Sequence, residues 1–342
     1  MIYGHGDDLF SYPDIQVNFS SNCYGGADHT GLEQHLVARL AGLIRSYPHP
    51  DAYDLKELIA RKGGLLPEQV SIFNGATEAI YAIARMRGAS LNYILGPTFS
   101  EYEAAALQAG SRICKLSAPS IREKADYPFE TGSSVWICNP NNPDGRVFEK
   151  ERLLHMIRRH PEVCFIIDQS YADFTDCPVL LNNEATENVI LINSLTKQYA
   201  IPGLRLGYVI ASTALTEKMA TYRMPWSVNA LAIEAGKYLL ADPVDFGALR
   251  RPLHAEVKRV KDALCACEKY EVYPTDTHFF LVRIKGESAA RLKETLAREH
   301  GLLIRNAENF APHYAGYFRI AVRTPEENDL LINALLHYAT HI

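Results

Sequence analysis

The stretch VILINSLTKQYAIPGLRLGY, which spans Val189–Tyr208, combines a short apolar run with a lysine close behind it. A lysine near the end of a buried strand is unusual. Taken alone, such a lysine is more often a surface residue whose aliphatic carbons cover apolar groups while its amine reaches solvent. Five more apolar runs are Val70–Phe73, Asn92–Leu95, Ser134–Cys138, Val163–Ile167 and Leu206–Ala211. Amphipathic segments lie between several of them, such as Thr77–Arg87 and Phe148–Arg159. Buried strands that alternate with helices predict an α/β fold, with a mostly parallel sheet covered on both faces.

The pattern changes near residue 240, which indicates a second domain. A long basic amphipathic helix is predicted first, at about Val244–Tyr270. It is followed by Thr277–Ile284, a helix at Ala289–Glu299, Leu302–Ile304, Tyr317–Val322 and a last helix opened by Thr324-Pro325-Glu326-Glu327. That opening carries the residues of a helix N-cap, with proline at the first helical position and a capping-box glutamate. We therefore predict a large α/β domain at 41–240 and a small α+β domain at 241–342. An N-terminal arm, residues 1–40, should pack with the small domain.

Composition excludes several classes of protein. The 342 residues carry 35 basic and 40 acidic side chains, a net charge of −5, which is a poor match to a nucleic-acid binder. No run of 18 apolar residues exists that could span a membrane, and the start MIYGHGDDLF lacks the apolar region of a signal peptide. The seven cysteines are scattered and odd in number, as expected in the reducing cytoplasm. They form no C-x-x-C pair, and we expect no metal site.

Polar residues follow directly after several predicted strands. Asn74-Gly75-Ala76-Thr77-Glu78 follows the first run, and such a turn offers free N–H groups to a phosphate, although alone it is more often a plain N-cap. Asp168 ends another run, and Tyr171 follows three residues on. A buried carboxylate there needs a cationic or hydrogen-bonding partner. Lys197 and Arg205 follow the run that starts at Val189.

Taken together, these residues point to one cofactor. In an open α/β sheet, ligands bind outside the carboxyl ends of the strands, so the groups that follow the strands should meet. A phosphate cradle, a carboxylate, a phenol, an amine and a guanidinium match pyridoxal phosphate (PLP). That molecule carries a phosphate, a basic ring nitrogen, a phenolic oxygen and an aldehyde. The constellation therefore predicts a PLP site.

The spacing of Asn142, Asp168, Tyr171, Lys197 and Arg205 resembles that of fold-type I PLP enzymes of the aspartate-aminotransferase superfamily. Within that superfamily the chain looks closest to the group that holds histidinol-phosphate aminotransferase and threonine-phosphate decarboxylase. Segments that favour the decarboxylase are Ser194–Tyr208, Met224–Ala232 and Leu303–Asn328, and the opening His5-Gly6 with Asn18–Asn22 looks similar as well. The resemblance spans nearly the whole chain.

The resemblance implies roles for individual residues. Lys197 would bind the cofactor aldehyde and move protons, Asp168 would pair with the ring nitrogen, and Tyr171 would hydrogen-bond the phenolic oxygen. The residues implied to contact the cofactor are Ala76, Thr77, Phe99, Asn142, Asp168, Tyr171, Ser194, Lys197, Arg205 and, from the neighbouring subunit of a homodimer, Tyr47. The residues implied to contact the substrate are Arg319 at its carboxylate and Arg305, Asn22 and His5 at its phosphate. A surface ion pair is the alternative for Arg305, and His5 alone is more often a residue without a site role.

Three positions depart from the pattern of the superfamily. Asp144 replaces the threonine of N-P-T-G, and Gln169-Ser170 replaces the E-A of D-E-A. Both lie beside retained cofactor residues and leave the PLP prediction intact. Cys23-Tyr24-Gly25-Gly26 replaces an Asn-Pro-x-Gly motif near the N-terminus, and this change concerns the substrate.

The resemblance implies decarboxylation of L-threonine O-3-phosphate to (R)-1-amino-2-propanol O-2-phosphate, a step in cobalamin side-chain synthesis. The alternative is transamination of a phosphorylated amino compound such as histidinol phosphate. A regulatory protein that keeps PLP without turnover is disfavoured by the complete set of reactive residues. A nicotinamide-dependent oxidoreductase is disfavoured because no G-x-G-x-x-G follows the first strand.

Overall fold

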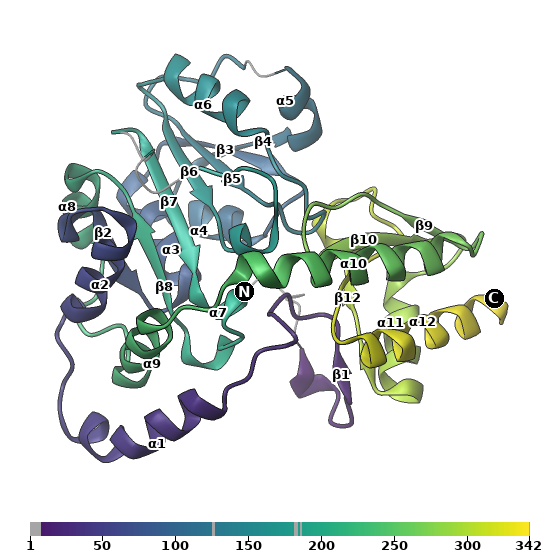
Figure 1. Ribbon diagram of the computed structural model, residues 1–342. Helices are drawn as coiled ribbons and strands as arrows, with labels where there is room; N and C mark the ends of the chain where they lie inside the picture. Colours follow the sequence, from purple (N-terminus) through teal and green to yellow (C-terminus); the bar gives the residue numbers. More distant parts are fainter. Residues whose placement is uncertain (1–7, 125–126, 181–183, 185–186, 342) are drawn as a thin grey trace.

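The computed structural model describes residues 8–124, 127–180, 184 and 187–341, and its centre is a seven-stranded sheet (Figure 1). The strands run in the order β2-β8-β7-β6-β5-β3-β4. Their bounds are β2 Val70–Phe73, β3 Leu91–Gly96, β4 Arg112–Ser117, β5 Ser134–Cys138, β6 Cys164–Asp168, β7 Val189–Ser194 and β8 Gly207–Ile210. All neighbours pair in parallel except β8, which is antiparallel to both β2 and β7. The predicted α/β fold with a mostly parallel sheet is confirmed.

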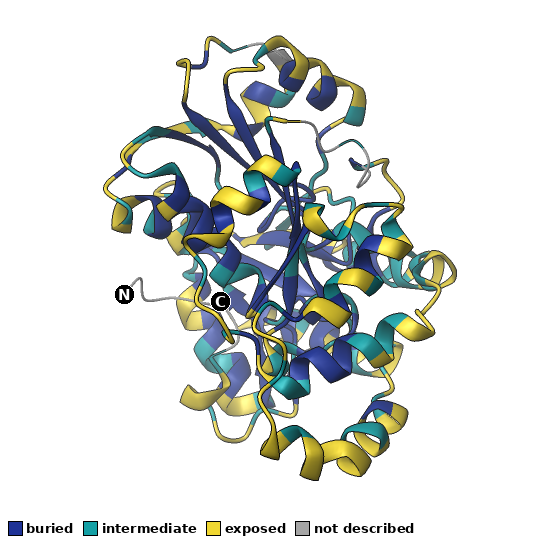
Figure 2. Cartoon of the chain, turned by 90° about the vertical axis from the view of Figure 1, so that its left-hand side faces the viewer, coloured by how far each residue is buried: buried dark blue, intermediate teal, exposed yellow. Residues whose placement is uncertain are grey.

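Helices cover both faces of this sheet because successive strand residues point to opposite sides and both sides are apolar. One face packs against α3 (Gly75–Arg87), α4 (Glu101–Gln108) and α8 (Thr213–Ala220). The other packs against α2 (Tyr53–Gly63), α5 (Ala118–Lys124), α6 (Lys150–Arg159) and α9 (Ala230–Ala241). Figure 2 shows the buried strands inside and the exposed residues on the outer helices. The carboxyl ends of β5, β6 and β7 therefore open at one edge.

A second, antiparallel sheet of four strands follows in the order β12-β13-β10-β9. Its strands are β9 Tyr270–Val272, β10 Phe279–Ile284, β12 Arg305–Asn306 and β13 Tyr317–Ala321. Three helices belong to the same core: α10 Phe246–Cys265, α11 Ala289–His300 and α12 Pro325–Thr340. The capping box predicted at Thr324 and Glu327 opens α12. The short strand β1 (Val17–Asn18) pairs in parallel with β11 (Leu302–Leu303), and Phe19 is buried in this core.

The three-part division predicted from the sequence agrees with these two cores, and we propose it as the domain organisation. Residue 40 falls inside α1 (Thr30–Arg45), and residue 240 falls inside α9. We therefore propose that each boundary lies at the end of its helix. Between β7 and β8 the chain forms the short helix α7 (Leu195–Gln198). Within the described part of the chain, no helix combines the length and apolarity that a bilayer crossing requires.

Candidate active site

One cavity lies at the carboxyl ends of the large sheet. Nine of the ten residues implied to contact the cofactor line it: Ala76, Thr77, Phe99, Asn142, Asp168, Tyr171, Ser194, Lys197 and Arg205. Asp168 is the last residue of β6 and Ser194 the last of β7, while Ala76 and Thr77 lie in the first turn of α3. The fold therefore brings together side chains that are far apart in the sequence.

Asp168 lies at the bottom of this cavity, with only 4% of its surface exposed. Its Oδ2 accepts a hydrogen bond of 2.8 Å from the Tyr102 hydroxyl. Its Oδ1 accepts bonds from the Ser170 hydroxyl at 2.6 Å and from the Ser170 amide at 2.9 Å. Burial raises the pKa of Asp168, and these hydrogen bonds, together with the charge of Lys197, oppose that rise. No cation among the described residues forms an ion pair with this carboxylate, so a positively charged ring nitrogen fits beside it.

The start of α3 and Arg205 lie close together at the same cavity. Gly75 has φ +79°, and a Cβ added to it would lie 2.6 Å from the Arg205 guanidinium. A Cβ on Gly207 would lie 2.7 Å from the amide nitrogen of Ala76. Both glycines therefore allow a close approach of backbone and guanidinium. The Ser194 and Thr196 hydroxyls, 2.7 Å apart, lie at the same cavity. Free N–H groups, a helix N-terminus and an arginine together suit a phosphate.

Tyr171 and Lys197 also line this cavity. Tyr171 is buried, and its hydroxyl accepts a bond of 3.3 Å from Asn22 Nδ2. Burial raises the pKa of Tyr171, and the charges of Lys197 and Arg319 oppose the rise. Lys197 belongs to α7, and its carbonyl accepts a bond of 2.8 Å from the Tyr24 amide. The N-terminal arm therefore reaches the backbone of the lysine.

A second cavity shares residues with the first and extends toward the small sheet. It adds Ser20, Ser21, Asn22, Arg305 and Arg319 to the shared residues Thr77, Phe99, Asn142, Tyr171, Lys197 and Arg205. Arg319 donates to Asn142 Oδ1 and, at 2.5 Å, to the Ser20 carbonyl. Arg305 donates to Asn309 Oδ1 at 3.0 Å, and its guanidinium lies 5.2 Å from the centre of the Phe310 ring. Three of the four residues implied to contact the substrate therefore meet beside Lys197.

The two arginines are buried cations that form no ion pair with an acidic residue among the described residues. Only 7% of Arg305 and 5% of Arg319 is exposed. Burial, followed by repulsion from Arg319, lowers the pKa of Arg305 to about 9. Burial likewise lowers the pKa of Arg319 to about 10. Such groups need anions to offset their desolvation, and a ligand can supply them.

Two predicted contacts are not part of this cluster. Tyr47 is 90% exposed and packs against Trp226, with 5.9 Å between the ring centres. It lies outside both cavities, and its contact with the cofactor of a neighbouring subunit stays a prediction. His5 lies outside the described residues.

The sequence did not single out two of the cavity residues, Tyr102 and Ser170, as contacts of Asp168. Ser170 stands at one of the departures from the superfamily pattern, so that change adds a hydroxyl donor to the carboxylate. Tyr102 lies at the start of α4, three residues after Phe99, and both residues line the cavity. Its short distance in sequence from Phe99 is the feature that could have identified it. Tyr102 also stacks on Trp136, with 5.5 Å between ring centres.

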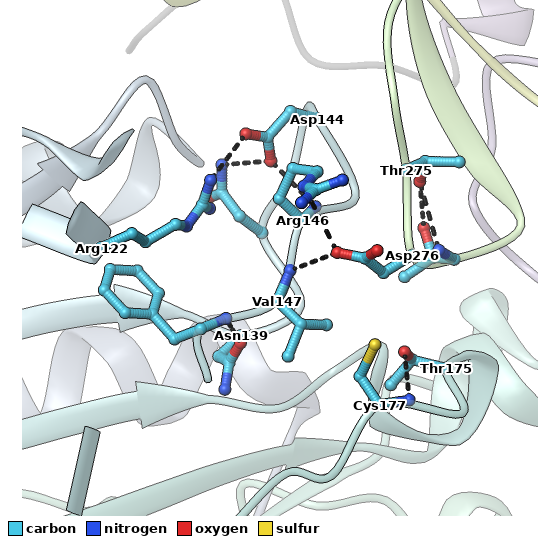
Figure 3. Close-up of polar contacts among 12 residues, drawn as sticks. Arg122, Asn139, Asp144, Arg146, Val147, Thr175, Cys177, Thr275 and Asp276 are labelled. Carbon is cyan, nitrogen blue, oxygen red and sulfur yellow. Dashed lines mark hydrogen bonds and ion pairs between the residues drawn. The ribbon is translucent and has the colours of Figure 1, made fainter. Parts of the chain in front are cut away.

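Asp144, another departure, holds the turn that carries Asn142 (Figure 3). Its Oδ1 accepts bonds from Asn141 Nδ2 at 2.8 Å and from the Arg146 amide at 3.1 Å. Its Oδ2 lies 3.3 Å from Arg122 Nη1. From the small domain, Asp276 Oδ2 accepts a bond of 3.0 Å from the Val147 amide. The turn is therefore fixed from both sides, and the aspartate supports the site.

Comparison with known proteins agrees with this geometry. Residues 14–335 match the family model described as aminotransferase class I and II. The chain is 30% identical to threonine-phosphate decarboxylase of Salmonella typhimurium strain LT2, over 96% of this chain and 93% of that protein.

Two solved structures are also similar. The L-threonine-O-3-phosphate decarboxylase of Porphyromonas gingivalis superposes with a TM-score of 0.89 at 36% identity, over 94% of this chain and 99% of that one. The histidinol-phosphate aminotransferase of Sinorhizobium meliloti in complex with pyridoxal-5'-phosphate superposes with a TM-score of 0.82 at 18% identity. That match covers 97% of this chain and 93% of the other, and it shows the fold alone.

Proposed function

The chain belongs to the aminotransferase class I and II family, and we propose that it is a PLP-dependent enzyme that decarboxylates L-threonine O-3-phosphate to (R)-1-amino-2-propanol O-2-phosphate. When bound, PLP supplies an electron sink for the bonding electrons released at the α carbon of the substrate. The product is the amino alcohol phosphate of the cobalamin side chain.

The residues of the first cavity fit this cofactor. Asp168 supplies a buried carboxylate for the ring nitrogen, and burial raises its pKa against the opposing effect of its hydrogen bonds and of the charge of Lys197. Arg205 and the first turn of α3 supply donors for the phosphate. Asn142 and Tyr171 would hydrogen-bond the phenolic oxygen, and Lys197 would supply the amine for the aldehyde; all three line this cavity.

The observation that carries the substrate assignment is the pair of buried arginines beside Lys197. Arg305 and Arg319 line one cavity and lack carboxylate partners among the described residues. A substrate with both a carboxylate and a phosphate offers each guanidinium one anion. Threonine phosphate carries both groups, whereas histidinol phosphate carries only the phosphate.

The chain's own groups then divide the work. Arg319 would hold the carboxylate and thereby orient the α carbon of the substrate. When the bond from the α carbon to the carboxylate breaks and carbon dioxide leaves, the α carbon needs a proton, and Lys197 Nζ delivers it. Asn142 connects the cofactor site with the carboxylate site, because it lines both cavities and accepts a hydrogen bond from Arg319.

Transamination of histidinol phosphate is the alternative, since an aminotransferase would use the same cofactor residues. The discriminating experiment incubates the purified enzyme with threonine phosphate, and separately with histidinol phosphate plus 2-oxoglutarate. We expect carbon dioxide from the first mixture and no glutamate from the second. Glutamate from the second, without carbon dioxide from the first, would replace decarboxylation by transamination.

We expect Arg305→Ala to raise the KM for threonine phosphate by about 30-fold or more, because a charge-assisted bond to phosphate is worth roughly 2–3 kcal/mol. The KM for unphosphorylated threonine should change little. Steady-state kinetics with both substrates measures the difference. Arg283→Ala, on the exposed side of β10, is the control. An equal rise for both substrates would contradict the assignment of Arg305 to the phosphate.

We also propose a cytoplasmic homodimer whose interface includes α1. Apolar side chains stand exposed on and near this helix, namely Val37, Leu40, Ile44, Tyr47, Met224 and Trp226. The helix lies at the lower end of Figures 1 and 2, where it is mostly exposed. Such an apolar surface is typical of a protein interface.

The seven cysteines are all free, which agrees with a reducing compartment.

Sedimentation analysis should give twice the chain mass of 38.3 kDa. A Val37→Glu, Ile44→Glu double variant should sediment as a monomer, because it places two charges in the proposed interface. Leu330→Glu, which changes an exposed leucine of α12, should remain dimeric. A dimeric double variant would exclude α1 from the interface.

A further inference from the structure

Arg323, between β13 and α12, binds the backbone of the N-terminal arm. Its Nε donates to the Asn18 carbonyl at 2.9 Å. Its Nη2 donates to the Ser21 carbonyl at 2.7 Å, and its Nη1 to the Cys23 carbonyl at 2.8 Å. One planar guanidinium therefore fixes three carbonyls of a segment that lies about three hundred residues earlier in the sequence.

The remaining carbonyls of this segment, residues 18–23, which we call the strap, are bonded as well. The Phe19 carbonyl accepts from the Ala321 amide at 3.0 Å, and the Ser20 carbonyl accepts from Arg319 Nη2 at 2.5 Å. The Asn22 carbonyl accepts from His278 Nε2 at 3.1 Å. Every strap carbonyl thus pairs with a residue between 278 and 323. The donors to these carbonyls therefore all come from the small domain.

The strap forms a wall of the substrate-side cavity. Ser20, Ser21 and Asn22 line it together with Arg305 and Arg319. The side chain of Asn22 donates to Tyr171, while its Oδ1 is buried without a partner among the described residues. The strap therefore presents polar groups to a ligand in this cavity.

Gly25 makes room for Arg323. A Cβ at Gly25 would lie 2.9 Å from Arg323 Cδ and 3.4 Å from its Cα, so a larger residue would displace the arginine. Gly25 belongs to Cys23-Tyr24-Gly25-Gly26, the segment that departs from the Asn-Pro-x-Gly motif. The segment that departs from the superfamily motif therefore contains the glycine that makes room for Arg323, the arginine that hydrogen-bonds the strap.

We infer that Arg323 is a positioning residue that sets the selectivity of this enzyme for phosphorylated substrates. It holds the strap so that Ser20, Ser21 and Asn22 complete the phosphate-binding wall around Arg305. Without the guanidinium, three carbonyls lose their donor and the strap moves, while Asp168 and Arg205 keep their places. The inference rests on the proposed function, because the phosphate belongs to the proposed substrate.

The first test compares Arg323→Ala, Arg323→Lys and Gly25→Ala with wild-type holoenzyme. Arg323→Ala and Gly25→Ala should each raise the KM for threonine phosphate about tenfold, equivalent to about 1.4 kcal/mol. The KM for unphosphorylated threonine and kcat should stay within about threefold, and the lysine variant should lie between. Arg259→Ala is the matched control. Arg259 is also a small-domain arginine with several acceptors, but it binds Glu256 and Asp329 outside the cavity. Equal KM changes for both substrates, or a loss confined to kcat, would overturn the inference.

A second measurement separates this inference from the proposed reaction. Inorganic phosphate is titrated into each holoenzyme, and the melting temperature and the visible cofactor spectrum are followed. Arg323→Ala should need about tenfold more phosphate than the wild type and the Arg259→Ala control for the same shift. Equal phosphate responses of the Arg323 variant and wild type would refute the role of Arg323. Absence of carbon dioxide release by wild type, with a normal difference in phosphate binding, would refute only the decarboxylation.

Discussion

Lys197→Ala is expected to lower the rate of decarboxylation by at least about 10⁴-fold, because it removes both the amine that binds the cofactor and the group that moves the proton. Cofactor binding should persist in this variant. Asp168, Arg205 and the first turn of α3 remain, and they contact the ring nitrogen and the phosphate in the proposed arrangement. Steady-state assays and cofactor titration measure the two effects separately.

Borohydride gives an independent readout for the same lysine. The wild-type holoenzyme should be yellow, and reduction should abolish its visible band and leave the cofactor attached to Lys197. Peptide mapping locates the adduct. Lys218→Ala, which removes an exposed lysine of α8, should behave like wild type. An adduct on any other lysine would show that the site is assigned wrongly.

Asp168→Ala is expected to keep the fold but to lower kcat by about 10²-fold or more, a typical effect of removing one preorganised charged group. Without the carboxylate, nothing in the first cavity favours a protonated ring nitrogen, and the electron sink weakens. Asp176→Ala, an exposed aspartate that pairs with Arg250, is the control. Turnover within about tenfold of wild type, which is about 1.4 kcal/mol of barrier, would disprove the role given to Asp168.

The same residue should affect the cofactor-free protein in the opposite direction. Because burial raises the folded-state pKa of Asp168, its ionised form destabilises the cofactor-free fold at neutral pH. That destabilisation disappears as the pH falls through the folded-state pKa. Asp168→Asn should therefore raise the Tm of the cofactor-free protein at pH 7 while it weakens cofactor binding. A lower Tm would mean that the carboxylate is already stabilised without the cofactor.

Much of the fold could be predicted because fully buried strands have a simple signature. The run Ser134–Cys138 coincides with β5, since all five residues are buried and polar residues flank them. The strand β4 was missed because it is a half-exposed edge strand with Arg112 and Lys115 in its sequence. The helix predicted to reach Tyr270 ends at Cys265, since Tyr270 starts β9 and pairs with Ile284. Tertiary pairing, which the local pattern does not encode, decides that end.

The cofactor side of the site could be predicted because each residue directly follows a recognisable strand or opens a helix after one. Asp168 and Lys197 are examples. The support of the substrate side could not be predicted in this way. Arg323 binds backbone carbonyls, and every residue type has a carbonyl. The sequence of the strap therefore does not indicate that Arg323 binds it. The proposed contact of Tyr47 involves a second chain, whose position a single sequence does not reveal.

The pairing of β1 with β11 also bears on how the polypeptide acquires its activity during synthesis. Val17 aligns with Leu302, so this ladder joins positions 302 − 17 = 285 residues apart. A growing chain of 300 residues already contains Lys197, Asp168 and the complete large sheet. It still lacks the strand and the arginine that hold the strap. The substrate-side wall can therefore form only after synthesis has passed Arg323, long after the residues of the large sheet have been made.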